Sequence, residues 1–135
     1  MIAPETRRIL IVDDQVEMAD MIADDLSDRG YETIALSSPR EALRRLATER
    51  FDALVTDVGM PEITGVALLR ASLRLDPSRP VILMTAYSTI ESVVLATNDG
   101  AYHYLLKPFR IDVLHRLIER ALKDGSSGPG HFPCP

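Results

Sequence analysis

Four short apolar runs in this sequence end in residues that could bind phosphate or a metal ion. Residues 53–56 lead into Asp57, residues 9–12 into a pair of acids, residues 81–84 into a threonine, and residues 102–106 into a lysine. If the runs are parallel strands, their carboxyl ends share one edge, which is where open α/β sheets bind ligands. We therefore expect these groups to form one polar site.

Three of these groups are the carboxylates of Asp13, Asp14 and Asp57. Carboxylates held within a few ångströms repel one another unless they share a proton or bind a cation. Together with a backbone carbonyl, for which Gly59 is the candidate, they form the oxygen ligand set that Mg²⁺ prefers, and Mn²⁺ is an alternative. The sequence thus predicts a divalent metal site.

The other two groups are the amine of Lys107 and the hydroxyl of Thr85. A metal ion, an ammonium and a hydroxyl around one carboxylate are what phosphoryl transfer onto Asp57 requires, because that transfer depends on positioning and charge neutralisation. Asp57 is the predicted acceptor, with Thr85 and Lys107 as its catalytic partners.

Strand and helix patterns alternate five times along the chain, which predicts an α/β fold. We expect one doubly wound, flavodoxin-like sheet of five parallel strands in the order 2-1-3-4-5, with five helices on its two faces. The expected strands are residues 8–12, 31–36, 52–56, 80–84 and 101–106. The expected helices are residues 15–29, a segment beginning at or just after Pro39, 64–75, 89–98 and 111–123.

Capping residues and apolar spacing refine these elements. Asp14 is positioned to cap the first helix and Gly30 to stop it, while Ser37 and Ser38 precede the second helix. Among the apolar residues, Met18, Met21 and Met84 are predicted to fill the core.

Composition limits the classes of function. A net charge of −5 predicts no direct nucleic-acid contact by this domain and no membrane association. The only cysteine, Cys134, cannot form an intrachain disulfide, and no apolar run is long enough for a signal peptide or a membrane span, so we expect a cytoplasmic protein. Residues 1–124 are predicted to form one domain. Residues 125–135 have the composition of a flexible linker or of a non-native tail.

These residues resemble the signature of response-regulator receiver domains of two-component signalling. The resemblance rests on Asp13-Asp14, Asp57 with Met60-Pro61, Thr85-Ala86 and Lys107-Pro108-Phe109, and it covers about residues 6 to 123. The segment 100–109 is also similar to receivers of NtrC-type transcription activators, which makes transcription regulation an expected output.

The resemblance implies a role for each residue. Asp57 would take a phosphoryl group from a sensor histidine kinase or a phosphotransfer protein, and Asp13 and Asp14 would hold Mg²⁺. Thr85 and Lys107 would contact the phosphoryl oxygens, with Lys107-Pro108 as a cis peptide. Tyr104 would change rotamer together with Thr85. The surface formed by residues 89–98, 101–106 and 111–123 would then repack for association with a partner or with a second copy in a homodimer. Such a domain is regulatory and not an enzyme, beyond its own phosphorylation and dephosphorylation.

Three alternatives belong to other classes of protein. A phosphatase with an aspartyl nucleophile needs a second acid two residues after it, where this chain has Gly59, and a nucleotide-binding loop is excluded because residues 13–15 hold no glycine cradle. The remaining alternative is a protein-interaction module that keeps the receiver fold and acts without phosphorylation.

Overall fold

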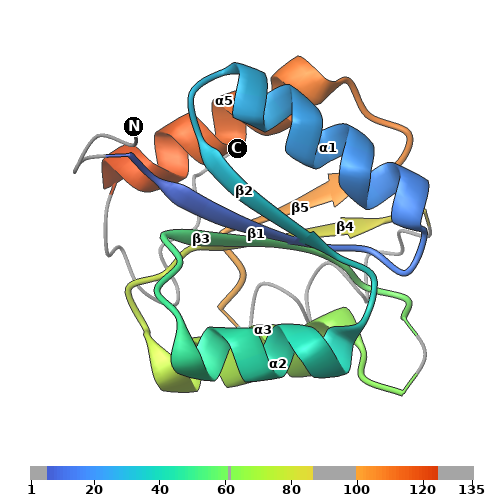
Figure 1. Ribbon diagram of the computed structural model, residues 1–135, viewed down its shortest axis with the longest axis vertical. Helices are drawn as coiled ribbons and strands as arrows, with labels where there is room; N and C mark the ends of the chain where they lie inside the picture. The colour runs from blue at the N-terminus through green and yellow to red at the C-terminus, as the bar shows by residue number, and fades with distance from the viewer. Residues whose placement is uncertain (1–5, 61, 87–99, 125–135) are drawn as a thin grey trace.

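A computed structural model describes residues 6–60, 62–86 and 100–124 of the chain (Figure 1). These residues contain one sheet of five parallel strands in the order β2-β1-β3-β4-β5, as the sequence predicts. The strands are β1 (Arg8–Val12), β2 (Glu32–Leu36), β3 (Ala53–Asp57), β4 (Val81–Thr85) and β5 (His103–Leu106). The order reverses between β1 and β3, which lie side by side at the switch point.

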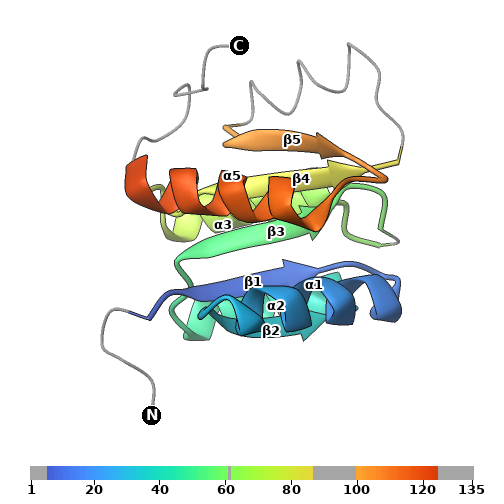
Figure 2. The same cartoon turned by 90° about the horizontal axis from the view of Figure 1, so that it is seen from above.

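Helices cover both faces of the sheet. The described residues contain α1 (Val16–Asp28), α2 (Pro39–Thr48), α3 (Gly65–Leu75) and α5 (Ile111–Asp124). Figures 1 and 2 show α1 and α5 on one face and α2 and α3 on the other. The helix predicted over residues 89–98 and the predicted tail of residues 125–135 lie outside the described residues.

Alternating side chains of β1 supply both layers of the core. Ile9 and Ile11 pack on the α1 and α5 side, whereas Leu10 and Val12 pack on the α2 and α3 side, and all four are buried. Successive side chains of a strand point to opposite faces, so a strand covered on both faces is apolar throughout. This explains the continuous apolar runs of β1, β3 and β4 in the sequence.

Helix starts follow the local sequence, with one exception. Ser38 caps α2 as predicted, since its hydroxyl accepts a hydrogen bond from the Glu41 N–H at 3.2 Å. The predicted cap of α1 is wrong, because the cap residue is Gln15 and not Asp14, and its side chain makes no capping hydrogen bond. The carboxylate of Asp13 supports this turn instead, accepting a hydrogen bond from the Gln15 N–H at 2.9 Å.

One of the three methionines assigned to the core is outside it. Met84 is buried and Met18 packs partly buried against the core, but the Met21 side chain is 53% exposed. Adjacent residues of a helix point about 100° apart, and Ile22 takes the inward direction that Met21 lacks.

Candidate functional site

Strand register brings the predicted acids to one edge of the sheet. Val12 of β1 is paired with Thr56 of β3, so the residues that follow, Asp13 and Asp57, lie next to each other. Asp57 is the last residue of β3, one residue later than the sequence predicted for the strand end. The carboxyl ends of the two central strands therefore carry the acids.

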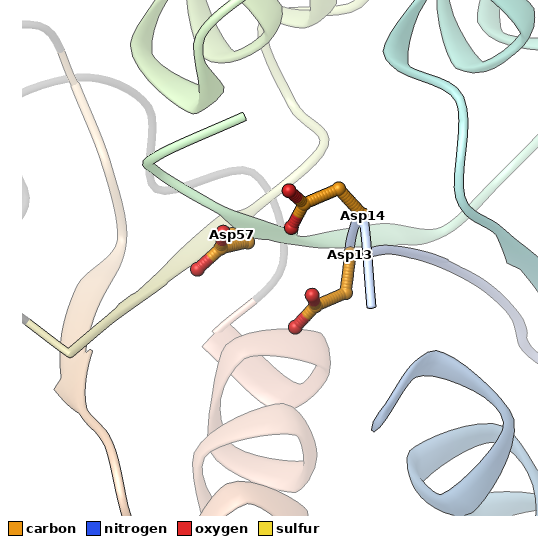
Figure 3. Close-up of side chains that lie close together, drawn as sticks. All are labelled: Asp13, Asp14 and Asp57. Carbon is orange, nitrogen blue, oxygen red and sulfur yellow. The ribbon is translucent and has the colours of Figure 1, made fainter. Parts of the chain in front are cut away.

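The carboxylates of Asp13, Asp14 and Asp57 form one cluster (Figure 3). Ligand oxygens from the three side chains all lie within 4.8 Å of one another. Asp13 is fully buried and Asp57 is 8% exposed, while Asp14 is exposed to solvent. Two of the three acids are thus shielded from water, and the third keeps the cluster accessible from solution.

Lys107 joins this cluster from the end of β5. Its Nζ lies 2.7 Å from Asp13 Oδ2 and 3.2 Å from Asp57 Oδ1. Burial alone would lower the pKa of Lys107, but the hydrogen bond and charge of Asp13, followed by those of Asp57, outweigh burial and raise the pKa. The amine is therefore held as a cation between two carboxylates from different strands.

Burial is also the largest influence on the pKa of the Asp57 carboxyl. It raises the pKa of Asp57, Lys107 opposes that change, and the negative charges of Asp13 and Asp14 add to it. The net pKa is above the usual range, so the ionised form of Asp57 is disfavoured by its surroundings. A cation bound among the three acids would relieve this cost.

The remaining predicted residues surround the cluster. Thr85 is the buried last residue of β4, and its carbonyl accepts a hydrogen bond from the Lys107 N–H at 2.7 Å. The Lys107–Pro108 peptide bond is cis. Tyr104 is half-buried on β5 and packs against the α2 and α3 side of the core. Gly59 lies in the exposed loop after β3, while Pro61 lies outside the described residues.

Sequence reasoning missed one residue that fixes the position of the Asp57 backbone. A Cβ at Gly65 would lie 2.2 Å from the Asp57 carbonyl oxygen, so only glycine allows the start of α3 to approach the end of β3. The Gly65 N–H donates to the Val58 carbonyl at 2.9 Å, and Thr64 caps the helix through the Ala67 N–H. The pair Thr64-Gly65 directly before an apolar helix was the signal that could have indicated this contact.

The donor set fits a hard divalent cation. Three carboxylates from adjacent strand ends offer oxygens at a spacing that one ion can bridge, and among the described residues no histidine or cysteine joins the cluster. Mg²⁺ binds through few protein oxygens and completes its shell with water, which suits a cluster with one exposed acid.

Comparison with known proteins places the chain in a family. Residues 9–119 match the family described as the response regulator receiver domain. The chain belongs to this family. Its receiver is 39% identical over 126 residues to the transcriptional regulatory protein ZraR of Escherichia coli strain K12, a match that covers 93% of this chain and 29% of that protein. It is 38% identical over 112 residues to the DNA-binding transcriptional regulator NtrC of Klebsiella pneumoniae, covering 83% of this chain and 24% of NtrC.

Solved structures share the receiver fold. A CheY-like receiver domain protein from Methanospirillum hungatei JF-1 superposes with a TM-score of 0.85 at 31% identity, covering 89% of this chain and 96% of that one. A Burkholderia pseudomallei response regulator with a phosphorylated aspartic acid, calcium ion and citrate superposes with a TM-score of 0.79 at 26% identity. This match covers 87% of this chain and 69% of that one. The beryllofluoride-activated NtrC4 receiver domain dimer superposes with a TM-score of 0.82 at 29% identity, covering 87% of this chain and 97% of that one.

The chain spans about a quarter of the length of the two transcription regulators. Within the described residues, no helix combines the length and apolar character needed to cross a bilayer.

Proposed function

We propose that this receiver domain accepts a phosphoryl group on Asp57 from a sensor histidine kinase or a phosphotransfer protein. The observation that carries the proposal is the position of Lys107, whose Nζ lies 3.2 Å from Asp57 and 2.7 Å from Asp13. An ammonium at this distance from the acceptor is placed to contact the oxygens of an incoming phosphoryl group.

In the proposed transfer, an Asp57 oxygen forms a P–O bond as the P–N bond of the donor phosphohistidine breaks. The imidazole leaves with the electron pair of that bond and takes up a proton. Lys107 and the hydroxyl of Thr85 would stabilise the charge on the equatorial oxygens. Asp13 holds Lys107 in place through its 2.7 Å contact, which makes Asp13 a positioning residue as well as a metal ligand.

Asp13, Asp14 and Asp57, with the carbonyl of Gly59, would hold Mg²⁺. When bound, this ion neutralises charge between the acceptor carboxylate and the phosphoryl oxygens. The tight spacing of the three carboxylates supports the assignment, and Mn²⁺ would fit the same oxygens.

Phosphorylation would act on the molecule through Thr85 and Tyr104. A phosphoryl group on Asp57 would attract the Thr85 hydroxyl, since both lie at adjacent strand ends, and Tyr104 would move into the space that Thr85 leaves. The surface of residues 89–98, β5 and α5 would then favour partner binding or a homodimer. The dimeric state of the activated NtrC4 receiver supports this expectation.

The proposed role is that of a cytoplasmic regulatory domain that catalyses at most its own phosphorylation and dephosphorylation. Residues 1–124 would be the receiver unit and residues 125–135 a linker or a non-native tail. Similarity to ZraR and NtrC supports control of transcription as the output, through a region outside this domain.

Intact mass spectrometry tests the proposal. The protein is incubated with acetyl phosphate and Mg²⁺, and a mass gain of one acid-labile phosphoryl group is expected. Asp57→Asn should abolish the gain, because an amide is not a phosphoryl acceptor of this kind. Asp52→Asn is the matched control, since it changes a similar acid at the opposite end of β3 and should leave the mass gain intact.

Two results would contradict the proposal. One is acid-labile phosphate on the Asp57→Asn variant. The other is the absence of any change in mass or in amide NMR shifts with acetyl phosphate or beryllofluoride and Mg²⁺, which would favour the phosphorylation-independent interaction module.

A further inference from the structure

A second polar surface lies at the amino edge of the sheet, at the opposite end of the strands from Asp57. It consists of two hollows of about 480 Å³ and about 180 Å³, which share Arg7 and Leu122 as lining residues. The start of β1 and the end of α5 lie at this edge (Figure 2). We name this surface the amino-edge groove and define it by its cationic lining residues, which are Arg7, Arg50, Arg79, Arg116, Arg120 and Lys123.

The charge of this groove is opposite to that of the whole chain. Its six cations are accompanied by three lining carboxylates, those of Asp52, Asp76 and Glu119, although the chain carries a net charge of −5. Arg120 and Lys123 are exposed on α5, and neither forms an ion pair with any residue that the structure describes. Positive charge is therefore available to an anionic partner.

The smaller hollow contains a cation that is costly to bury. Arg79 is only 5% exposed, and its Nε and Nη2 donate to the hydroxyl and carbonyl of Ser72 at 3.0 and 3.4 Å. Within the described part of the chain, no carboxylate lies within ion-pair distance of this guanidinium. A buried guanidinium gains most from a carboxylate, which matches its planar pair of donors.

The groove also has an apolar part. Tyr31 is half-buried and lines the larger hollow, Phe51 is buried beside the smaller one, and Leu122 belongs to both. A single inorganic anion would use only the charges, whereas a chain with both acidic and apolar side chains would use the whole lining. Arg7 and Leu122 line both hollows, so the two hollows lie side by side, which suits an extended ligand.

From these observations we infer that the amino-edge groove binds an acidic segment of a partner polypeptide. Carboxylates of the segment would pair with Arg79 inside the smaller hollow and with Arg120 and Lys123 at the rim, and an apolar side chain would pack on Tyr31 and Leu122. The groove shares no residue with the phosphoacceptor cluster, so the inference is independent of the proposed phosphorylation.

Binding of a fluorescein-labelled peptide rich in Glu and containing two Leu residues tests the inference. Fluorescence anisotropy at low salt should show saturable binding that weakens as salt is added, and a Lys-rich peptide of the same length should not bind. The double variant Arg120→Glu/Lys123→Glu should weaken binding by roughly tenfold or more, because it replaces attraction by repulsion at the rim. Amide NMR shifts on peptide addition should centre on Arg7, Tyr31 and Lys123.

The matched control is Arg40→Glu/Arg44→Glu, which makes the same change in net charge on exposed α2 side chains outside the groove. This variant should bind the peptide nearly as well as the wild type. Absence of saturable binding, or an equal loss in both double variants, would overturn the inference. Inorganic phosphate displacing the peptide at equal concentration would overturn it in favour of a small-anion site. Self-association that depends on Arg120 and Lys123 would overturn it by making a second copy the occupant.

Discussion

The two ends of the same sheet carry opposite charges, and they differ in how far these charges are buried. At the carboxyl edge, Asp13 and Asp57 are withdrawn from water and share the single cation of Lys107. At the amino edge, most charges remain in solvent, where Arg50 is 89% exposed and reaches Asp52 at 3.8 Å. Exposed pairs of this kind contribute about 0 to 1 kcal/mol, whereas removing one partner of a buried pair costs about 3 to 5 kcal/mol.

The difference shows at which edge of the sheet charged groups are buried at a cost in free energy. Burial and the nearby acids at the carboxyl edge raise the pKa of Asp57 and disfavour its charged form, a cost that a bound cation would offset. Among the described residues of the amino edge, Arg79 carries a comparable cost, since burial lowers its pKa and the charges of Asp76 and Asp52 offset that change only in part. Substitutions at matched positions of the two edges can test this contrast.

The largest effect is expected for Lys107→Met. Loss of the ammonium beside Asp57 should slow phosphorylation by acetyl phosphate about 100-fold, the usual loss when a charge-stabilising donor is removed from a reacting group. Lys123→Met at the amino edge removes the same side chain and should leave the rate unchanged. Stopped-flow or quenched-flow assays of phosphoryl uptake measure both, and equal rates for the two variants would contradict the role of Lys107.

Gly65→Ala should have the next largest effect. The added Cβ would lie 2.2 Å from the Asp57 carbonyl, so β3 and α3 must separate, and we expect a loss of about 2 kcal/mol in the free energy of unfolding. Gly59→Ala is the control, because apart from its chain neighbours no atom of the described residues lies within 4 Å of the Cβ position there. Urea denaturation compares the two variants, and similar midpoints would show that the close approach is not needed.

Tyr102 near the amino edge provides a prediction for pH. Burial, followed by the hydrogen bond from its hydroxyl to Asp124 at 2.7 Å, raises the pKa of Tyr102 to about 12 from 10.0. The protonated phenol is thus favoured by folding, so its contribution is complete below pH 10 and is lost as the pH rises through 12.

Tyr102→Phe should therefore cost about 1 kcal/mol at neutral pH and less as the pH increases from 10 to 12. The measurement is the difference in unfolding free energy between wild type and variant across this range, because other tyrosines affect both proteins equally. A difference that does not change with pH would show that the hydrogen bond is not responsible.

The smallest effect is expected for Glu62→Gly in the loop after β3. Glu62 has a φ of 68°, which is unfavourable for a residue with a Cβ, and its ion pair with Arg40 is exposed. Glycine relieves the backbone strain, but its greater freedom in the unfolded chain offsets part of this effect. The free energy of unfolding should therefore rise by about 0.5 kcal/mol. Thermal unfolding would show a slightly higher midpoint. A lower midpoint would mean that the Glu62 side chain contributes to the loop.

The site at the carboxyl edge could be predicted from the sequence because each of its residues is marked by its immediate neighbours in the chain. Each of Asp13, Asp57, Thr85 and Lys107 ends or follows an apolar run, and parallel topology alone then brings the run ends together. The cap of α1 was assigned to Asp14 because a helix start shifted by one residue changes which side chain reaches the first turn.

Features that depend on tertiary packing could not be predicted in this way. The burial of Arg79 depends on how α3 meets the turn before β4, and the need for glycine at position 65 depends on the closeness of β3. Neither contact has a periodic pattern in the sequence. Met21 was assigned to the core, but Ile22 takes the inward direction on α1 and leaves the Met21 side chain 53% exposed.

Anomalous diffraction from crystals soaked in Mn²⁺ shows whether acids from two strands share one divalent ion beside Lys107. We expect one strong peak about 2.0 to 2.3 Å from oxygens of Asp13 and Asp57, directly or through one water from Asp14, and no such peak in the Asp57→Asn variant. A peak bound elsewhere on the surface with none among these three carboxylates would contradict it.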